Sequence, residues 1–172
     1  MMEILFLSTY HPSYIKPLKK WAGILRDGGF RVIERYRDTT YKEDVLEEIG
    51  FGRDLLVYFG HGIPGAWCGY GTIDYTDFHQ VHPHRYIKTV LSFSCYSLSR
   101  HRGPSIGDVF IRHLKAKEFA GFKGRIPYSD NLQCFEAIML HLLQGDILNA
   151  AYKVPVPLRW MRAKEPQANK GR

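Results

Sequence analysis

Two side chains that can carry out nucleophilic chemistry follow two separate apolar segments of the chain. His61 comes after residues 55–59 and Gly60, and Cys95 comes after residues 86–93 and Ser94. Both apolar runs are typical of buried parallel strands, whose carboxyl ends lie at the same edge of a sheet. There an imidazole can take the thiol proton, the thiolate can attack a carbonyl carbon, and the imidazolium can protonate the leaving amine. The separation of 34 residues (95 − 61) suits a connection that brings the two strands side by side.

The glycines on both sides of His61 suit such a site. Gly60 permits a sharp exit from the strand, and Gly62 lets a substrate approach the backbone closely. The backbone N–H groups of Gly62 and Cys95 are candidate oxyanion donors, because that role needs no side chain. A lone cysteine at a strand end is usually a small core residue, and a lone histidine there is usually structural. The pair of matching strand ends is what favours a catalytic site.

Other residues near His61 allow more than one interpretation. Asp74 and Asp77 could orient the imidazole or receive a basic substrate side chain, or they could be polar turn residues. Trp67 could line a substrate cleft. The clustered His79, His82 and His84 suggest zinc, but no cysteine or carboxylate beyond Asp77 completes a familiar spacing, so no metal site is predicted.

Alternating strand and helix patterns predict an α/β fold with a mostly parallel sheet covered on both faces. The predicted strands cover residues 3–10, 30–36, 55–59, 86–93 and 118–122, and the predicted helices cover residues 13–27, 41–49, 105–114, 135–143 and 146–151. The segment 64–78 is expected to be a loop or hairpin over one end of the sheet.

The length of 172 residues suits one domain, predicted to cover residues 1–153. Of the net charge of +7, the tail of residues 154–172 carries +4, which favours a solvated end over a nucleic-acid surface, although Trp160 hints that the tail docks. Three cysteines without paired spacing indicate a reducing compartment. With no signal sequence or membrane-spanning run recognised, a cytoplasmic protein without a membrane partner is expected.

Two motifs resemble those of gingipain-type and CHAT-domain cysteine peptidases, relatives of the caspases. Residues 57–62 (VYFGHG), followed by Trp67, are similar to the histidine motif of these peptidases. Residues 91–97 (LSFSCYS) are similar to the strand that presents the catalytic cysteine. The resemblance extends over residues 55–152 and includes the downstream helix, strand and helix.

The resemblance implies a caspase-like three-layer α/β/α sandwich and a cysteine endopeptidase that needs no cofactor. His61 would be the general base and acid, Cys95 the nucleophile that forms a thioester, and Gly62 an oxyanion donor. Phe93 stands where caspases and metacaspases carry a residue that shapes the pocket for the substrate side chain, so their specificities are not inherited. A protein or peptide substrate and an activating protein partner are expected. The alternative is a catalytically inactive member of the fold that serves as an interaction or signalling module.

Overall fold

A computed structural model describes residues 1–9, 11–37, 40–69, 71–145 and 158–164. Its centre is a six-stranded sheet with strand order β2-β1-β3-β7-β8-β9. The strands are β1 (Glu3–Ser8), β2 (Arg31–Tyr36), β3 (Leu55–Phe59), β7 (Thr89–Phe93), β8 (Glu118–Gly121) and β9 (Arg159–Arg162). The first five are parallel, and β9 runs antiparallel to β8 at the sheet edge. All five residues of β3 are buried, as expected for a central parallel strand.

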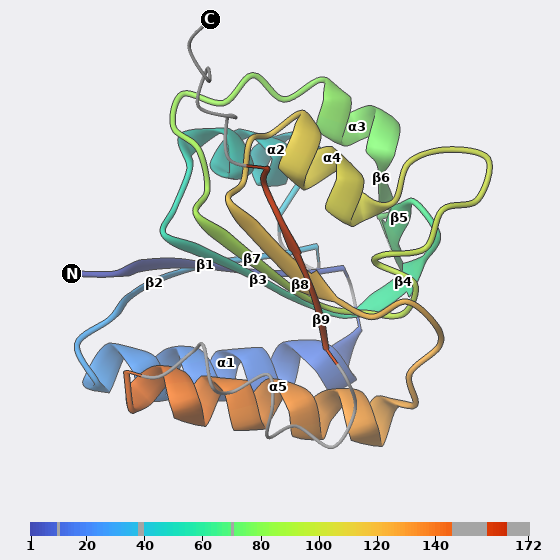
Figure 1. The fold of residues 1–172 in the computed structure, drawn as a ribbon. Coiled ribbons are helices and arrows are strands. Elements are labelled where there is room, and N and C mark those ends of the chain that lie inside the picture. Colours follow the sequence, from blue (N-terminus) through green and yellow to red (C-terminus); the bar gives the residue numbers. More distant parts are fainter. Residues whose placement is uncertain (10, 38–39, 70, 146–157, 165–172) are drawn as a thin grey trace, which may run out of the picture.

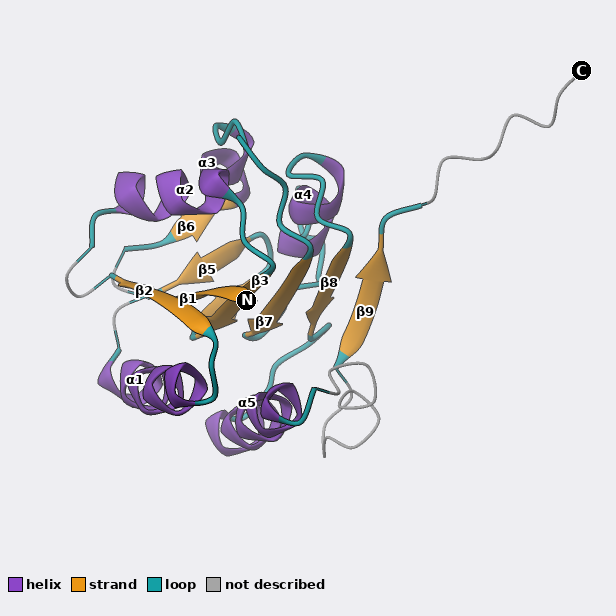
Figure 2. Ribbon diagram, turned by 90° about the vertical axis from the view of Figure 1, so that its left-hand side faces the viewer, coloured by secondary structure: helices purple, strands orange, loops and turns teal. Residues whose placement is uncertain are grey.

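Helices cover both faces of this sheet (Figures 1 and 2). One face carries α1 (Pro12–Asp27) and α5 (Tyr128–Leu143), and the other carries α2 (Lys42–Phe51), α3 (Tyr75–His79) and α4 (Ile106–Arg112). The side chains of β3 alternate between the two cores, with Val57 in the α1/α5 core and Leu56 in the other. The predicted three-layer α/β/α architecture with a mostly parallel sheet is therefore confirmed.

A small antiparallel sheet follows β3 and begins at His61. It consists of β4 (His61–Ile63), β5 (Ala66–Cys68) and β6 (Ile73–Asp74), in that order. The hairpin between β4 and β5 turns at Pro64 and Gly65, where Gly65 has a φ of 79°. This agrees with the loop or hairpin expected from residue 64 onward, and it places His61 at the very start of the second sheet.

Three elements differ from the sequence-based expectation. Helix α5 begins at Tyr128 rather than near residue 135, because its polar first turn is anchored by Asn131, whose Nδ2 donates to the carbonyl of Phe93 at 2.9 Å. The short helix α3 lies inside the segment expected to be a loop. Residues 159–162 of the basic tail form β9 rather than a solvated end. The helix predicted at 146–151 lies outside the described residues.

Two further features bear on the sequence-based expectations. Within the described residues, no helix has the length and apolar character needed to cross a bilayer. Cys68, Cys95 and Cys134 form no disulfide, and of these three only Cys134 is completely buried.

Candidate active site

The ends of β3 and β7 bring His61 and Cys95 to neighbouring positions. The two strands pair in parallel register, and their last pair is Phe59 with Phe93. The amide of Gly60 continues the ladder by donating to the carbonyl of Phe93 at 3.2 Å. His61 and Cys95 each follow two residues after this last pair, so both leave the same edge of the sheet at equivalent positions.

Glycine packing brings the two segments together. A Cβ built on Gly62 would collide with the carbonyl oxygen of Cys95 and lie 2.9 Å from Ser94 Oγ. A Cβ on Gly60 would lie 2.5 Å from the hydroxyl of Tyr58. That same hydroxyl donates to the carbonyl of His61 at 2.7 Å. The absence of a side chain at both glycines thus permits the contacts that hold His61 and Cys95 in place.

The imidazole of His61 is exposed on one side and contacts α1 and the preceding loop on the other. Its Nδ1 lies 3.5 Å from the hydroxyl of Tyr14, and the ring centroids of these residues are 4.9 Å apart. The ring of His11 lies 5.5 Å away in an edge-on arrangement. Partial burial, followed by repulsion from His11, lowers the pKa of His61 from its usual 6.5. A neutral imidazole, which can accept a proton, therefore predominates at neutral pH.

The tyrosine beside His61 remains protonated. Burial is the main cause that raises the pKa of Tyr14 to about 12, and the thiolate form of Cys95 adds to it. Tyr14 therefore offers a neutral hydroxyl that can either donate to or accept from Nδ1 of His61.

The thiol of Cys95 is half-buried under the loop that joins β8 to α5. Its Sγ accepts a hydrogen bond from the amide of Ile126 at 3.2 Å and lies 3.4 Å from the carbonyl of the same residue. The next residue, Tyr96, has a φ of 60°, in the left-handed region that non-glycine residues seldom adopt. Its amide donates to the carbonyl of Gly124 at 3.0 Å, which fixes the turn after the cysteine.

Three buried serines support this turn from below. The hydroxyls of Ser92, Ser94 and Ser97 lie 2.8–3.0 Å from one another. Trp67 donates its indole N–H to Ser92 Oγ at 2.9 Å and stacks on Tyr58, with ring centroids 4.2 Å apart. The backbone on both sides of the candidate site therefore rests on one buried polar network.

The predicted pocket residues have other surroundings. Trp67 and Phe93 are completely buried, Trp67 in the α2/α3/α4 core and Phe93 in the α1/α5 core, so neither lines an open cleft. Strand alternation turns both large side chains inward, which the sequence motif does not reveal. Asp74 and Asp77 form a reciprocal capping box at the start of α3, and Asp77 also pairs with Lys42 at 3.1 Å. These contacts match the turn-residue interpretation of the two aspartates.

The histidines of residues 79–84 have the following surroundings in the structure. Within the part of the chain that is described, no three metal-ligating side chains come close enough to hold an ion. His79 instead packs edge-on against His113, with ring centroids 5.1 Å apart.

Several residues around His61 and Cys95 are not predicted by the sequence. Tyr14 lies in the helix predicted for residues 13–27, and nothing in its spacing predicts its contact with His61. His11 follows the carboxyl end of β1, the edge where ligands bind in such sheets, and that position was the available signal. Cys68 is the cross-strand partner of His61, which follows from the short hairpin.

A central parallel sheet with a histidine and a cysteine at neighbouring strand ends defines the caspase-like fold of clan CD cysteine peptidases. The chain belongs to one family within it, peptidase family C25, whose family model matches residues 6–153. The resemblance to gingipain-type peptidases seen in the sequence motifs is confirmed.

Solved structures agree in fold. The chain superposes on the Arg-specific cysteine proteinase gingipain R with a TM-score of 0.70 and 16% identity, over 86% of this chain and 38% of that chain. It superposes on a complex of the pro- and mature domains of RgpB from Porphyromonas gingivalis with a TM-score of 0.67 and 17% identity, over 82% and 37% of the two chains. The chain therefore spans little more than a third of these proteins. A comparison with curated proteins finds no match.

Proposed function

We propose that this chain is a cysteine endopeptidase in which His61 and Cys95 form the catalytic dyad. The observation that carries the proposal is the placement of both residues at equivalent positions after adjacent parallel strands, with Gly62 packed against the Cys95 carbonyl. Membership of peptidase family C25 supports peptide-bond hydrolysis as the reaction.

The proposed reaction proceeds in two stages. His61 takes the proton of the Cys95 thiol, the thiolate attacks the substrate carbonyl carbon, and the imidazolium gives its proton to the leaving amine. A water molecule, deprotonated by His61, then attacks the thioester and releases the second product and the free thiol. The lowered pKa of His61 supports its role as the base.

The backbone around Gly62 supports the assignment of an oxyanion donor. In the β4–β5 hairpin Ile63 and Ala66 flank the two-residue turn, and Gly62 pairs with Trp67 one position further on. In such hairpins the pair beside the turn is typically hydrogen-bonded and successive antiparallel pairs alternate. We therefore expect Gly62 to occupy a non-hydrogen-bonded pair, with its N–H directed away from β5. The second donor would be the amide of Cys95, adjacent to the reacting sulfur.

The contacts that cover the Cys95 thiol support a need for activation before a substrate can reach the sulfur. The Ile126 backbone contacts Cys95 Sγ through both its amide and its carbonyl, so a substrate carbonyl must displace these contacts. We expect a protein or peptide substrate and a protein partner that moves the loop between β8 and α5. The RgpB structure, a complex of pro- and mature domains, is a precedent for protein contact in that protein. The cytoplasmic location stays a prediction.

The same contacts favour one second candidate. A thiol held permanently by the Ile126 backbone would leave a catalytically inactive member of the fold that acts as an interaction or signalling module. The two functions differ in whether peptide bonds are cut.

A peptide-cleavage assay tests the proposal. The protein is incubated with a diverse peptide mixture, and the products are identified by mass spectrometry. Replacing Cys95→Ala or His61→Ala is expected to lower the rate by about 10⁴-fold or more, because the two groups act as a unit. Cys68→Ala and His101→Ala, which change a second thiol and an exposed imidazole, should still cut. Cuts that survive in Cys95→Ala would refute the assignment, and a wild-type protein that never cuts would favour the inactive module.

A further inference from the structure

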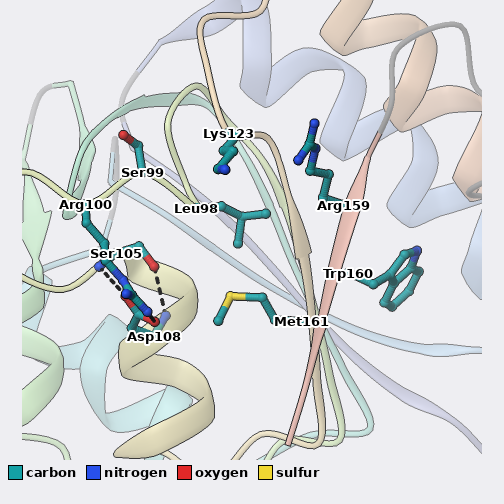
Figure 3. A pocket seen from close by; sticks show the side chains of 9 residues that line it. All are labelled: Leu98, Ser99, Arg100, Ser105, Asp108, Lys123, Arg159, Trp160 and Met161. Atoms are coloured by element: carbon teal, nitrogen blue, oxygen red, sulfur yellow. Dashed lines mark hydrogen bonds and ion pairs between the residues drawn. The ribbon is translucent and has the colours of Figure 1, made fainter.

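A cavity of about 580 Å³ lies between α4 and the β8–β9 edge of the sheet (Figure 3). It is lined by Leu98, Ser99, Arg100, Ser105, Asp108, Lys123, Arg159, Trp160 and Met161. The segment that follows Cys95 supplies three of these residues, and the tail strand β9 supplies three more. Neither His61 nor Cys95 lines the cavity, so it is separate from the dyad.

The cavity carries unneutralised positive charge. Its single acid, Asp108, accepts two hydrogen bonds from Arg100, at 2.6 and 2.7 Å, and one from the amide of Ser105 at 2.9 Å. Lys123 and Arg159 are exposed, and in the part of the chain that is described neither forms an ion pair. Arg100 and Asp108 therefore cancel, and two cations remain to face a ligand.

The floor between the charged groups is apolar. Leu98 and Met161 point into the cavity, while the indole of Trp160 points away from it on the far side of β9 (Figure 3). Strand alternation explains this, because Arg159 and Met161 share one face of β9 and Trp160 occupies the other. A Cβ on Gly107 would lie 2.8 Å from both Leu98 Cδ2 and Met161 Sδ, so these two apolar side chains pack closely over this position of α4. Positively charged side chains beside an apolar surface suit a ligand group that carries a carboxylate on a short aliphatic chain.

The cationic end of the cavity is joined directly to the candidate active site. The amides of Tyr96 and Leu98 donate to the carbonyls of Gly124 and Phe122, at 3.0 and 3.1 Å. These two bonds flank Lys123, which is thereby fixed opposite the segment that follows Cys95. Arg159 pairs with Gly121 at the carboxyl end of β8, on the same edge of the sheet. The cavity lining begins at Leu98, three residues after Cys95, so we expect a peptide held at Cys95 to extend toward this cavity.

We infer that this cavity is a specificity subsite that receives an acidic side chain, Glu or Asp, of the peptide substrate. The inference rests on the proposed peptidase function and adds a second recognition point away from the scissile bond. Lys123 and Arg159 bind the carboxylate, and Leu98 and Met161 contact its methylene groups.

A binding experiment tests the subsite without catalysis. The full chain with Cys95→Ala is immobilised and exposed to two peptide libraries that differ only in carrying Glu and Asp or their amides Gln and Asn. Acidic peptides should be retained about tenfold more strongly at low salt, a preference that rising salt weakens. Lys123→Glu with Arg159→Glu should abolish the preference, and Lys123→Gln with Arg159→Gln should reduce it. Lys19→Glu with Arg112→Glu, an equal charge change at exposed sites outside the cavity, should leave it intact.

Cleavage by the wild-type protein provides a second test of the subsite. The acidic residue should stand at one fixed distance from the cut, and the charge-reversed pair should lose that preference while still cutting amide-containing peptides. Equal retention of the two libraries, equal loss in the Lys19/Arg112 control, or cutting without an acidic preference would overturn the subsite. Acid-selective retention without any cutting would support the cavity as a binding site for acidic peptides and favour the inactive module over the peptidase, so the two failures are distinguishable.

Discussion

At the scale of single residues, Gly62 connects the two halves of the candidate site. Its Cα faces the carbonyl of Cys95 and the hydroxyl of Ser94, so the histidine and cysteine segments touch through a position without a side chain. A larger residue here must separate the segments. Reactive groups displaced by about 1 Å can lose about 10²-fold in rate.

Gly62→Ala should therefore lower peptide cleavage by about 10²-fold or more. It should also reduce the free energy of unfolding by about 1–3 kcal/mol, because the added methyl group overpacks a closed space. Gly124→Ala is the matched control, since a Cβ there has nothing within 4 Å although the residue lies in the loop over Cys95. Rates from a peptide assay and unfolding in urea measure both effects. Full activity in Gly62→Ala would contradict the close approach of the segments.

Residue types alone predicted a dyad of His61 and Cys95, but they did not predict what surrounds these two residues. His61 and Cys95 were recognisable because each stands two residues after the end of an apolar run. The burial of Trp67 and Phe93 was not recognisable, because the pattern does not say which face of a strand each side chain occupies. The contact of Tyr14 with His61 joins residues 47 positions apart, and only the folded chain brings them together.

At the scale of elements, α4 depends on the residues at its start. Ser105 and Asp108 form a capping box, in which Ser105 Oγ accepts from the amide of Asp108 and Asp108 accepts from the amide of Ser105. Arg100 binds the same carboxylate with two hydrogen bonds. The Arg100 contact is the main cause that holds the pKa of Asp108 at about 2, below its usual 3.8. Asp108 thus fixes the helix start and one wall of the cationic cavity.

Asp108→Asn should lower the free energy of unfolding by about 1–2 kcal/mol at pH 7, because a cap and charge-assisted hydrogen bonds are lost. Since the folded pKa lies below the unfolded one, the wild-type advantage is complete above pH 3.8 and falls as the pH drops toward 2. Urea unfolding of both proteins at pH 7 and pH 3 measures this. Asp27→Asn, at an exposed carboxylate, should change little. A difference in unfolding free energy between wild type and Asp108→Asn that grows below pH 4 would contradict the predicted direction of the pH dependence.

Elements with strong periodicity were predictable, and those decided by tertiary contacts were not. The run 55–59 and the helix face of α1 follow directly from apolar spacing. Strand β9 carries arginines at both ends and alternates Trp160 with Met161, a pattern too short to separate from a solvated tail. Residues 159–162 form a strand because they pair with the otherwise open edge of β8, and no local sequence pattern encodes that edge.

At the scale of the whole molecule, the sheet brings together chemistry that is dispersed along the chain. Parallel connections place the ends of β1, β3, β7 and β8 at one edge, so His11, His61, Cys95 and the loop over the thiol meet there. The two cores on opposite faces hold these strands in register. The central claim is that this arrangement makes His61 the base that activates Cys95.

Thiol reactivity tests that claim most directly, because it requires no knowledge of the substrate. The native protein is treated with iodoacetamide at pH 7, and the modification rate of each cysteine is measured by mass spectrometry. Burial raises the pKa of Cys68, and Cys134 is completely buried, so these thiols serve as internal references. Cys95 should react about tenfold faster than Cys68 and slow by a similar factor in His61→Ala, while His101→Ala leaves its rate unchanged. A Cys95 that reacts no faster than Cys68, or at the same rate without His61, would contradict the dyad.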